Sequence, residues 1–119
     1  MAIIKPFCGV RPPKHVVEQL SARPYDVLSS EEAREEAGDN TKSLYRISRP
    51  EINFESGTDE HDERVYGEAA RQYALFRENG WLQKDETECY YLYAETWRGK
   101  TQHGIVVAAS AEDSRNGVI

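Results

Sequence analysis

Residues 88–107 read ECYYLYAETWRGKTQHGIVV. Aromatic and branched side chains alternate along both halves of this stretch, a pattern typical of β-strands, and Arg98-Gly99 between the halves is a turn signal. The stretch therefore predicts an antiparallel hairpin with strands over 88–97 and 101–110. Because both faces of each strand are largely apolar, we expect the hairpin to lie centrally, covered on at least one side by a long helix.

Two helices are predicted in the first third of the chain. Pro13 suits the first turn of a helix and precedes a short apolar stripe, which indicates a helix over 13–21. A second helix should begin after Ser29, because Glu32 follows it at capping-box spacing. Gly38 should end that helix.

The longest helix is expected over 59–79. Thr58 is the expected N-cap, because the acidic residues that follow it would favour the positive end of the helix dipole. Asn79-Gly80 should end the helix, and Trp81-Leu82 should cover that end. The apolar stripe expected to face the core is Val65, Ala69, Tyr73 and Phe76.

The remaining segments predict short strands and loops. A strand over 2–8 should lie at a sheet edge or a bulge, since Pro6 cannot donate to a ladder. Residues 43–48 alternate weakly and are interpreted as a strand, and 51–57 as a loop. The expected fold class is α+β, with a small mixed sheet centred on the C-terminal antiparallel hairpin and about three helices.

The chain has 119 residues and a formal net charge of −6 at pH 7. This length predicts a single domain over residues 1–119. The longest apolar run, residues 89–94, is far shorter than a membrane span, so we expect no membrane association and a cytoplasmic location. Cys8 and Cys89 are then expected to be reduced, buried thiols and not a disulfide.

Motifs for metal, nucleotide and acyl-transfer chemistry are absent. No P-loop, G-x-G-x-x-G or G-x-S-x-G sequence occurs, and the three histidines lack ligand spacing. The cluster Asp59-Glu60-His61-Asp62-Glu63 has ligand-type side chains, but acidic residues in a first helical turn are the ordinary helix-start pattern. We therefore expect no metal site, and we interpret the aromatic strand as core rather than as a base-stacking platform.

Charge suggests where a ligand could bind. Up to Tyr25 the chain holds four basic residues and one carboxylate, while the rest is acidic. The acidic bulk disfavours nucleic acid. The basic segment favours a small anion, such as a phosphate or carboxylate, and the candidate binding residues are Arg11, Arg23, Tyr25 and Asp26. The alternative is that Arg23 and Asp26 form an ordinary surface pair while Tyr25 packs.

Several short stretches resemble a bacterial and archaeal family known as domain of unknown function 1015. They are AIIKPFCGVRP (2–12), RPYDVLS (23–29), RPEI (49–52), GTD (57–59), VY (65–66) and NGVI (116–119). The resemblance runs over nearly the whole chain. It implies that the chain is the N-terminal portion of a longer protein, in which a basic, histidine-containing stretch follows Val118-Ile119.

The resemblance also implies a remote relation to the ParB/sulfiredoxin-like fold, some of whose members hydrolyse nucleotides or phosphorylate free serine. The sequence departs from the family pattern at Arg46, where a histidine is common, and at Asn53, where an aspartate is common. This departure puts any proton-transfer or metal role at the two positions in doubt.

Two functions follow as expectations. The first is a nucleotide-dependent phosphotransferase or nucleotidase that uses ATP or ADP with Mg²⁺, in which the candidate residues orient phosphate or a small polar substrate. The second is a non-catalytic module that binds a nucleotide or a protein partner. The second expectation rests on the lack of a complete catalytic set in the sequence, which leaves open whether the chain is an enzyme.

Overall fold

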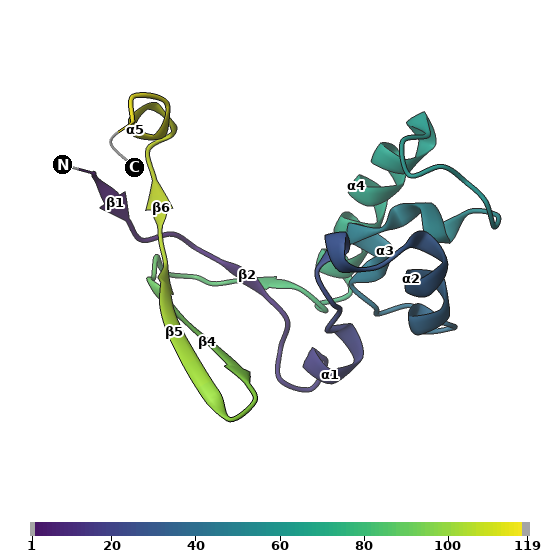
Figure 1. Cartoon of the computed structure of the whole chain (residues 1–119), viewed down its shortest axis with the longest axis horizontal. Helices are drawn as coiled ribbons and strands as arrows, with labels where there is room; N and C mark the ends of the chain where they lie inside the picture. The colour runs from purple at the N-terminus through teal and green to yellow at the C-terminus, as the bar shows by residue number, and fades with distance from the viewer. Residues whose placement is uncertain (1, 118–119) are drawn as a thin grey trace. The chain divides into compact units, whose positions relative to one another are not determined.

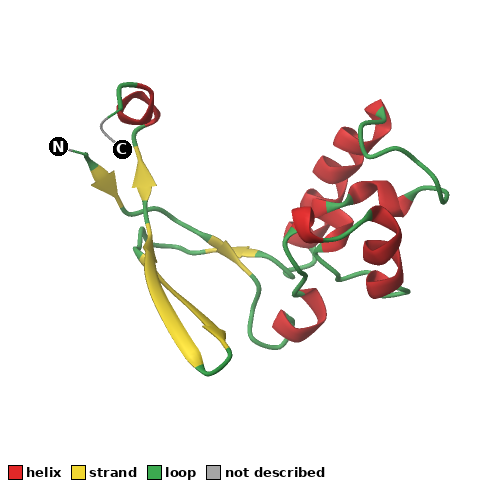
Figure 2. Ribbon diagram, in the orientation of Figure 1, coloured by secondary structure: helices red, strands yellow, loops and turns green. Residues whose placement is uncertain are grey.

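The computed structural model describes residues 2–117 and divides into two compact units. Unit 1 contains the chain up to Val10 and from Lys84 onward, and unit 2 contains Arg11–Gln83. Figures 1 and 2 show the helices and short strands along the chain. The expected α+β class is confirmed: residues 2–117 contain small antiparallel strand pairs and five α-helices, where about three helices were expected.

Unit 2 is helical. Its elements are α1 (Val17–Leu20), the 3-10 turn η1 (Tyr25–Val27), α2 (Ser30–Ala37), α3 (Tyr45–Ser48), the 3-10 turn η2 (Pro50–Asn53) and α4 (Glu63–Glu78). The two-residue strands β2 (Val10–Arg11) and β3 (Gln83–Lys84) contain the points where the chain passes from one unit to the other. Among the helices of residues 2–117, none is long and apolar enough to cross a membrane.

The predicted start and end of α2 are confirmed. The Ser29 hydroxyl accepts from the Glu32 N–H at 3.2 Å, and the Glu32 carboxylate accepts from the Ser29 N–H at 3.1 Å. This reciprocal pair satisfies two N–H groups that no helical carbonyl can reach. Gly38 follows the helix at a φ of +49°, a region that favours glycine.

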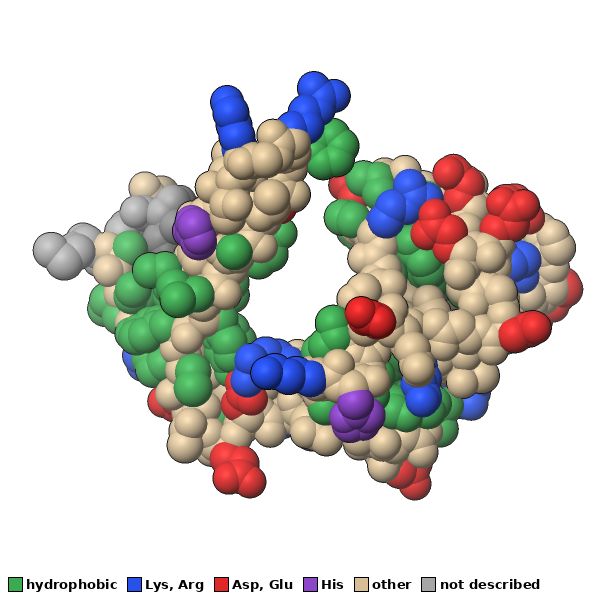
Figure 3. Space-filling view, turned by 90° about the horizontal axis from the view of Figure 1, so that it is seen from below, with side chains coloured by type: hydrophobic (Ala, Val, Ile, Leu, Met, Phe, Trp, Pro, Cys, Tyr) green, Lys and Arg blue, Asp and Glu red, His purple; other side chains and the backbone are tan. Residues whose placement is uncertain are grey.

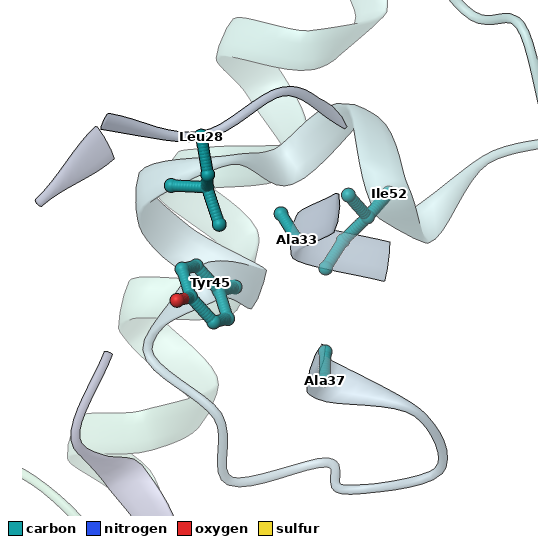
Figure 4. Close-up of a cluster of buried hydrophobic side chains, with 5 residues drawn as sticks. All are labelled: Leu28, Ala33, Ala37, Tyr45 and Ile52. Atoms are coloured by element: carbon teal, nitrogen blue, oxygen red, sulfur yellow. The ribbon is translucent and has the colours of Figure 1, made fainter. Parts of the chain in front are cut away.

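A compact cluster forms the core between α2, α3 and η2. Its buried members are Leu28, Ala33, Ala37, Tyr45 and Ile52 (Figure 4). The two alanines present no bulk, so the neighbouring segments approach α2 closely. Full burial of a side chain such as Leu28 or Ile52 stabilises the unit by about 2 kcal/mol.

The segment expected to be a strand over 43–48 is instead helical, as α3. The backbone N–H of Ile47 donates to Leu44 O at 2.9 Å, and that of Arg49 donates to Tyr45 O at 2.8 Å. The alternation was too short to set the local structure. Burial of the Tyr45 ring against α2 decides the segment instead.

Helix α4 begins later than expected. Asp62 is its N-cap and accepts from the Arg64 N–H at 3.0 Å, whereas the Thr58 hydroxyl donates to Glu55 O at 2.7 Å. Thr58 is therefore not the cap. The Thr58 side chain instead closes a turn in the loop before the helix.

Helix α1 is shorter than the helix predicted over 13–21.

The buried stripe of α4 differs from the expected one at one position. Val65 and Phe76 are buried and Ala69 is half-buried, but Gln72 occupies the place assigned to Tyr73, which is exposed. Positions 65, 69, 72 and 76 follow the 3.6-residue period more closely than a stripe through 73 does. The sequence pattern had favoured the aromatic ring over the polar amide.

The end of α4 agrees with the sequence. The helix ends at Glu78, and Gly80 has a φ of +74°. The backbone N–H of Trp81 turns back to donate to Phe76 O at 2.9 Å. The rings of Phe76 and Trp81 pack edge to face, with 5.1 Å between their centroids, so the end is covered as expected.

Unit 1 is built on the predicted hairpin. Its elements are β1 (Ile4–Lys5), β4 (Tyr91–Trp97), β5 (Lys100–Val106), β6 (Ala108–Ala109) and α5 (Ala111–Arg115). β4 pairs antiparallel with β5 through the Arg98-Gly99 turn, and β1 pairs antiparallel with β6 (Figure 1). The strand expected over 2–8 is shorter than predicted, because Pro6 cannot donate to a ladder: two residues form β1, and Phe7 forms an isolated bridge with Cys89.

The hairpin is not the covered centre that its apolar faces predicted. Every residue of β5 is exposed, and so is all of β4 except Tyr91. Leu92 is 86% exposed and Trp97 71%. Every buried hydrophobic side chain of residues 2–117 lies between Val16 and Leu82, so the described core belongs to unit 2.

A tyrosine holds the inner end of the hairpin. The Gly9 N–H donates to the Tyr91 hydroxyl at 2.5 Å, and this hydroxyl donates to Asp85 Oδ2, also at 2.5 Å. The hydrogen bond to Asp85, together with burial, raises the pKa of Tyr91 above its ordinary value. The Phe7 ring packs 5.1 Å from the Tyr91 ring, so one side chain ties three segments of unit 1.

Cys8 and Cys89 do not form a disulfide, and both are half-buried. Phe7 and Cys89 face each other in the bridge, so Cys8, the next residue along, is directed to the opposite face. Helix α5 was not foreseen. The family residues Val118-Ile119 lie outside the described part of the chain.

Gly9→Ala should destabilise unit 1 selectively. A Cβ at this position would lie 2.7 Å from both Cζ and the hydroxyl oxygen of Tyr91, and such overpacking costs about 1–3 kcal/mol. Hydrogen exchange of the β4 and β5 amides should therefore accelerate. Gly67→Ala is the control, because no atom lies within 4 Å of its added Cβ. Unchanged protection of the hairpin in Gly9→Ala would show that Tyr91 does not hold it.

Candidate functional site

The four residues expected to bind an anion lie on three different segments of the chain. Arg11 is exposed in β2, and Arg23 lies in the loop before η1. Tyr25 and Asp26 are both exposed and share η1. The hydrogen bonds of the Arg23 side chain go to Glu36 and not to Asp26, so the surface pair considered from the sequence does not form.

Arg23 is engaged by acidic groups of α2. Its Nε donates to Glu36 Oε2 at 3.4 Å, its Nη2 pairs with Glu36 Oε1, and Glu32 lies 3.9 Å away. The Tyr45 hydroxyl also donates to Glu36. The Tyr45 hydrogen bond and then the Arg23 guanidinium lower the pKa of Glu36 below its ordinary value. An anion at Arg23 would have to compete with these carboxylates.

Tyr25 borders one hollow of unit 2, a cavity of about 340 Å³. Its charged groups centre on Arg49, whose side chain is 9% exposed. Arg49 Nε lies 3.4 Å from Glu51 Oε1, and Nη1 pairs with Glu60. Two carboxylates thus surround one guanidinium, so this hollow has an excess of negative charge before any ligand enters.

Glu51 is itself fixed in place. Its side chain is 1% exposed, and its Oε1 accepts from the Ser30 hydroxyl at 2.8 Å. Arg49 Nη2 also donates to Leu28 O at 2.6 Å. These bonds join α2, η2 and the loop before α2, although the buried Nε of Arg49 makes no hydrogen bond of its own. Because removal of either charge would leave the other buried without its partner, the pair is expected to be structural.

A second hollow, of about 440 Å³, is more polar and is lined in part by Arg46. The guanidinium donates from Nε to Asn40 O at 3.3 Å, from Nη1 to Asn53 Oδ1 at 3.1 Å and from Nη2 to Gly38 O at 2.7 Å. All three acceptors are neutral. Arginine has five N–H donors, so one on each terminal nitrogen is left by these bonds.

Arg46 and Asn53, the two positions that depart from the family pattern, are direct partners. Arg46 donates to the Asn53 side chain, and the Asn53 amide donates to Arg46 O at 3.1 Å. This reciprocal pair joins α3 to η2. The bond to Gly38 O also satisfies a carbonyl at the C-terminal end of α2, where a cation is favourable.

The other charged groups of this hollow partly offset one another. Arg71 donates from Nε to Glu68 Oε2 at 3.0 Å, and Gln72 donates to Glu68 Oε1 at 3.0 Å. Asp39 is exposed at the rim. Of the two arginines that line this hollow, Arg46 is therefore the one whose hydrogen bonds all go to neutral groups. This makes it a better anion receptor than Arg23, Arg49 or Arg71, each of which pairs with a carboxylate.

Sequence reasoning did not select Arg46 as a binding residue. The residue lay in a segment interpreted as a strand, where its neighbours at 38–40 and 53 could not be foreseen. Its departure from the family pattern was the one signal that singled it out. Within residues 2–117, no group of three or more His, Cys, Asp or Glu side chains is placed to hold a metal ion.

Comparison with known proteins gives one family. The family model described as protein of unknown function (DUF1015) matches residues 4–119. No curated protein and no solved structure matches the chain.

The Glu36 interactions predict a pH dependence. Because the folded-state pKa of Glu36 is lowered, its ionised form stabilises the fold above the unfolded-state pKa, and this contribution is lost as pH falls through the folded-state pKa. Urea unfolding over a range of acidic pH should show this loss in the wild type and a smaller one in Glu36→Gln. Glu35→Gln, on the same helix, is the control. Identical pH profiles for Glu36→Gln and the wild type would contradict the prediction.

Proposed function

We propose that this chain, which belongs to the DUF1015 family of proteins of unknown function, is a non-catalytic module that binds a nucleotide or similar phosphate compound at the Arg46 hollow. The observation that carries the proposal is a guanidinium held rigidly by three neutral oxygen atoms at the wall of a concave site. Arginine recognises phosphate through paired N–H donors, and Arg46 retains one on each terminal nitrogen.

The size and lining of the hollow support a small ligand. Its volume of about 440 Å³ falls within the range typical of small-molecule sites. Ile52 and Leu75 supply apolar wall, and Asn53, Gln72 and Thr41 supply polar groups. A ring with a hydrogen-bonding edge and an attached phosphate would use both kinds of surface.

Binding is favoured over catalysis by the titratable groups of the lining. Among the described residues that line the hollow, Asp39 is the one carboxylate, and none is a histidine or a cysteine. Phosphoryl transfer with Mg²⁺ generally requires carboxylates that hold the metal and a further group that orients the nucleophile. The enzyme hypothesis therefore receives less support from this site than the binding hypothesis.

The test is calorimetric titration of the chain with ADP and with pyrophosphate. Arg46→Gln should abolish binding, and Arg46→Lys should weaken it about tenfold or more, because lysine lacks the paired donors. Arg23→Gln is the matched control, since it removes a guanidinium from the other candidate site. Circular dichroism should establish that each variant is folded, because Arg46 also satisfies Gly38 O.

Asp39→Asn tests the same site by a predicted gain of binding, which loss of structure could not produce. Removal of this rim carboxylate should strengthen ADP binding by roughly two- to fivefold at low salt, because it removes a repulsion between like charges. Binding that survives Arg46→Gln, or that Arg23→Gln abolishes, would overturn the assignment to this hollow.

A further inference from the structure

The strand β5 combines full exposure with an unusual charge. Its seven residues, Lys100–Val106, include one lysine and one histidine but no carboxylate, and Arg98 precedes them in the turn. The whole chain has a net charge of −6. We propose that β5 binds an extended acidic segment of a partner protein, which adds a strand to its open edge. This surface is independent of the Arg46 hollow.

The backbone of β5 is available for such pairing. β4 and β5 form a two-stranded sheet, so within the described chain each has one edge that faces no strand. The two-residue turn makes Trp97 and Lys100 a hydrogen-bonded pair, and pairs alternate from there. Thr101, His103 and Ile105 therefore direct their N–H and C=O groups outward.

A side-chain contact agrees with this assignment. The Thr96 and Thr101 hydroxyl oxygens lie 2.8 Å apart, as expected for a non-hydrogen-bonded pair, in which side chains approach most closely. An added strand would satisfy the outward groups. Main-chain pairing of this kind supplies affinity, and alternate side chains supply specificity.

The faces of the hairpin offer apolar contacts to alternate residues of a partner. Leu92 and Ile105 are directly opposite each other on one face, and Ile105 is 65% exposed. Trp97 lies on the other face, opposite Lys100. Figure 3 shows exposed hydrophobic side chains and projecting Lys and Arg side chains on the surface. An isolated two-stranded hairpin is marginally stable in water, so a third strand would also stabilise unit 1.

The turn is unusual in a way that favours recognition. Arg98 has a φ of +51° and is the one non-glycine residue with positive φ in residues 2–117. Asparagine, aspartate or glycine would adopt this conformation more easily. The Arg98 guanidinium lies 5.5 Å from the centre of the Trp97 ring. A strained arginine is thus displayed beside an exposed ring and Lys100, where acidic side chains would be attracted.

Charge favours an acidic peptide over the other occupants of an open edge. A second copy pairing through β5 would bring no carboxylate to Lys100, because β5 itself has none, so it would lack the charge complementarity of an acidic segment. Nucleic acid would find the same basic strand and exposed rings, but the net negative chain would repel its phosphates. An acidic peptide is attracted by the strand and lacks a dense phosphate backbone.

Fluorescence anisotropy with the full chain tests the proposal. The probe is a labelled peptide that alternates valine and glutamate, and the matched control alternates valine and lysine. The acidic peptide should bind at least about tenfold more tightly, with affinity that falls as salt increases. On binding, amide resonances of Thr101, His103 and Ile105 should shift in NMR spectra.

Two variants identify the edge. His103→Pro removes an outward N–H without removing a hairpin bond, so binding should weaken roughly three- to tenfold. Lys100→Glu should weaken it about tenfold or more. Lys84→Glu makes the same charge change on β3 and should bind as the wild type does. Arg46→Gln should also bind normally, which separates this site from the proposed nucleotide site.

Several outcomes would overturn the proposal. These are equal binding of the two peptides, no binding of either, or no effect of both β5 variants. Tighter binding of labelled oligothymidine than of the acidic peptide would assign the surface to nucleic acid. Dimerisation in sedimentation experiments that His103→Pro abolishes, without peptide binding by the wild type, would assign the edge to a second copy.

Discussion

The arrangement of unit 2 depends on one tyrosine that is buried at its ring and engaged at its hydroxyl. The ring of Tyr45 is part of the cluster formed with α2 and η2. Its hydroxyl donates to Glu36 and accepts from the Arg23 N–H, the latter at 3.1 Å. Because Tyr45 begins α3, its burial fixes the orientation of that short helix, which too few residues form to be stable alone.

The Arg49 and Arg46 hollows of unit 2 follow from this orientation. Arg49, one helical turn after Tyr45, is directed toward the interior and is surrounded by Glu51 and Glu60. Arg46 is directed elsewhere, toward the carbonyl oxygens of Gly38 and Asn40 and the side-chain oxygen of Asn53. Two arginines three residues apart thus acquire different electrostatic environments. One is neutralised by carboxylates, whereas the other retains the charge that anion binding requires.

Unit 1 has a different physical basis. Hydrogen bonds of Tyr91 and the strand ladders hold it, while the described apolar core lies in unit 2. Little apolar burial implies that its elements open at low free-energy cost. The hairpin exposes apolar side chains and unpaired backbone edges, and a strand added there would increase its stability. Binding of the proposed strand would therefore also stabilise this unit.

The sequence by itself determined the features that depend on neighbours along the chain. The α2 capping box, the glycines after α2 and α4, and the hairpin turn were predictable because adjacent residues satisfy their hydrogen bonds. The family was likewise recognisable from short motifs. Tertiary structure alone decided that residues 45–48 are helical, that Gln72 is buried where Tyr73 was expected, and that the hairpin is exposed. It also separated Arg23, paired with Glu36, from Arg46, because a charge acquires its partners from segments that only the packed chain brings together.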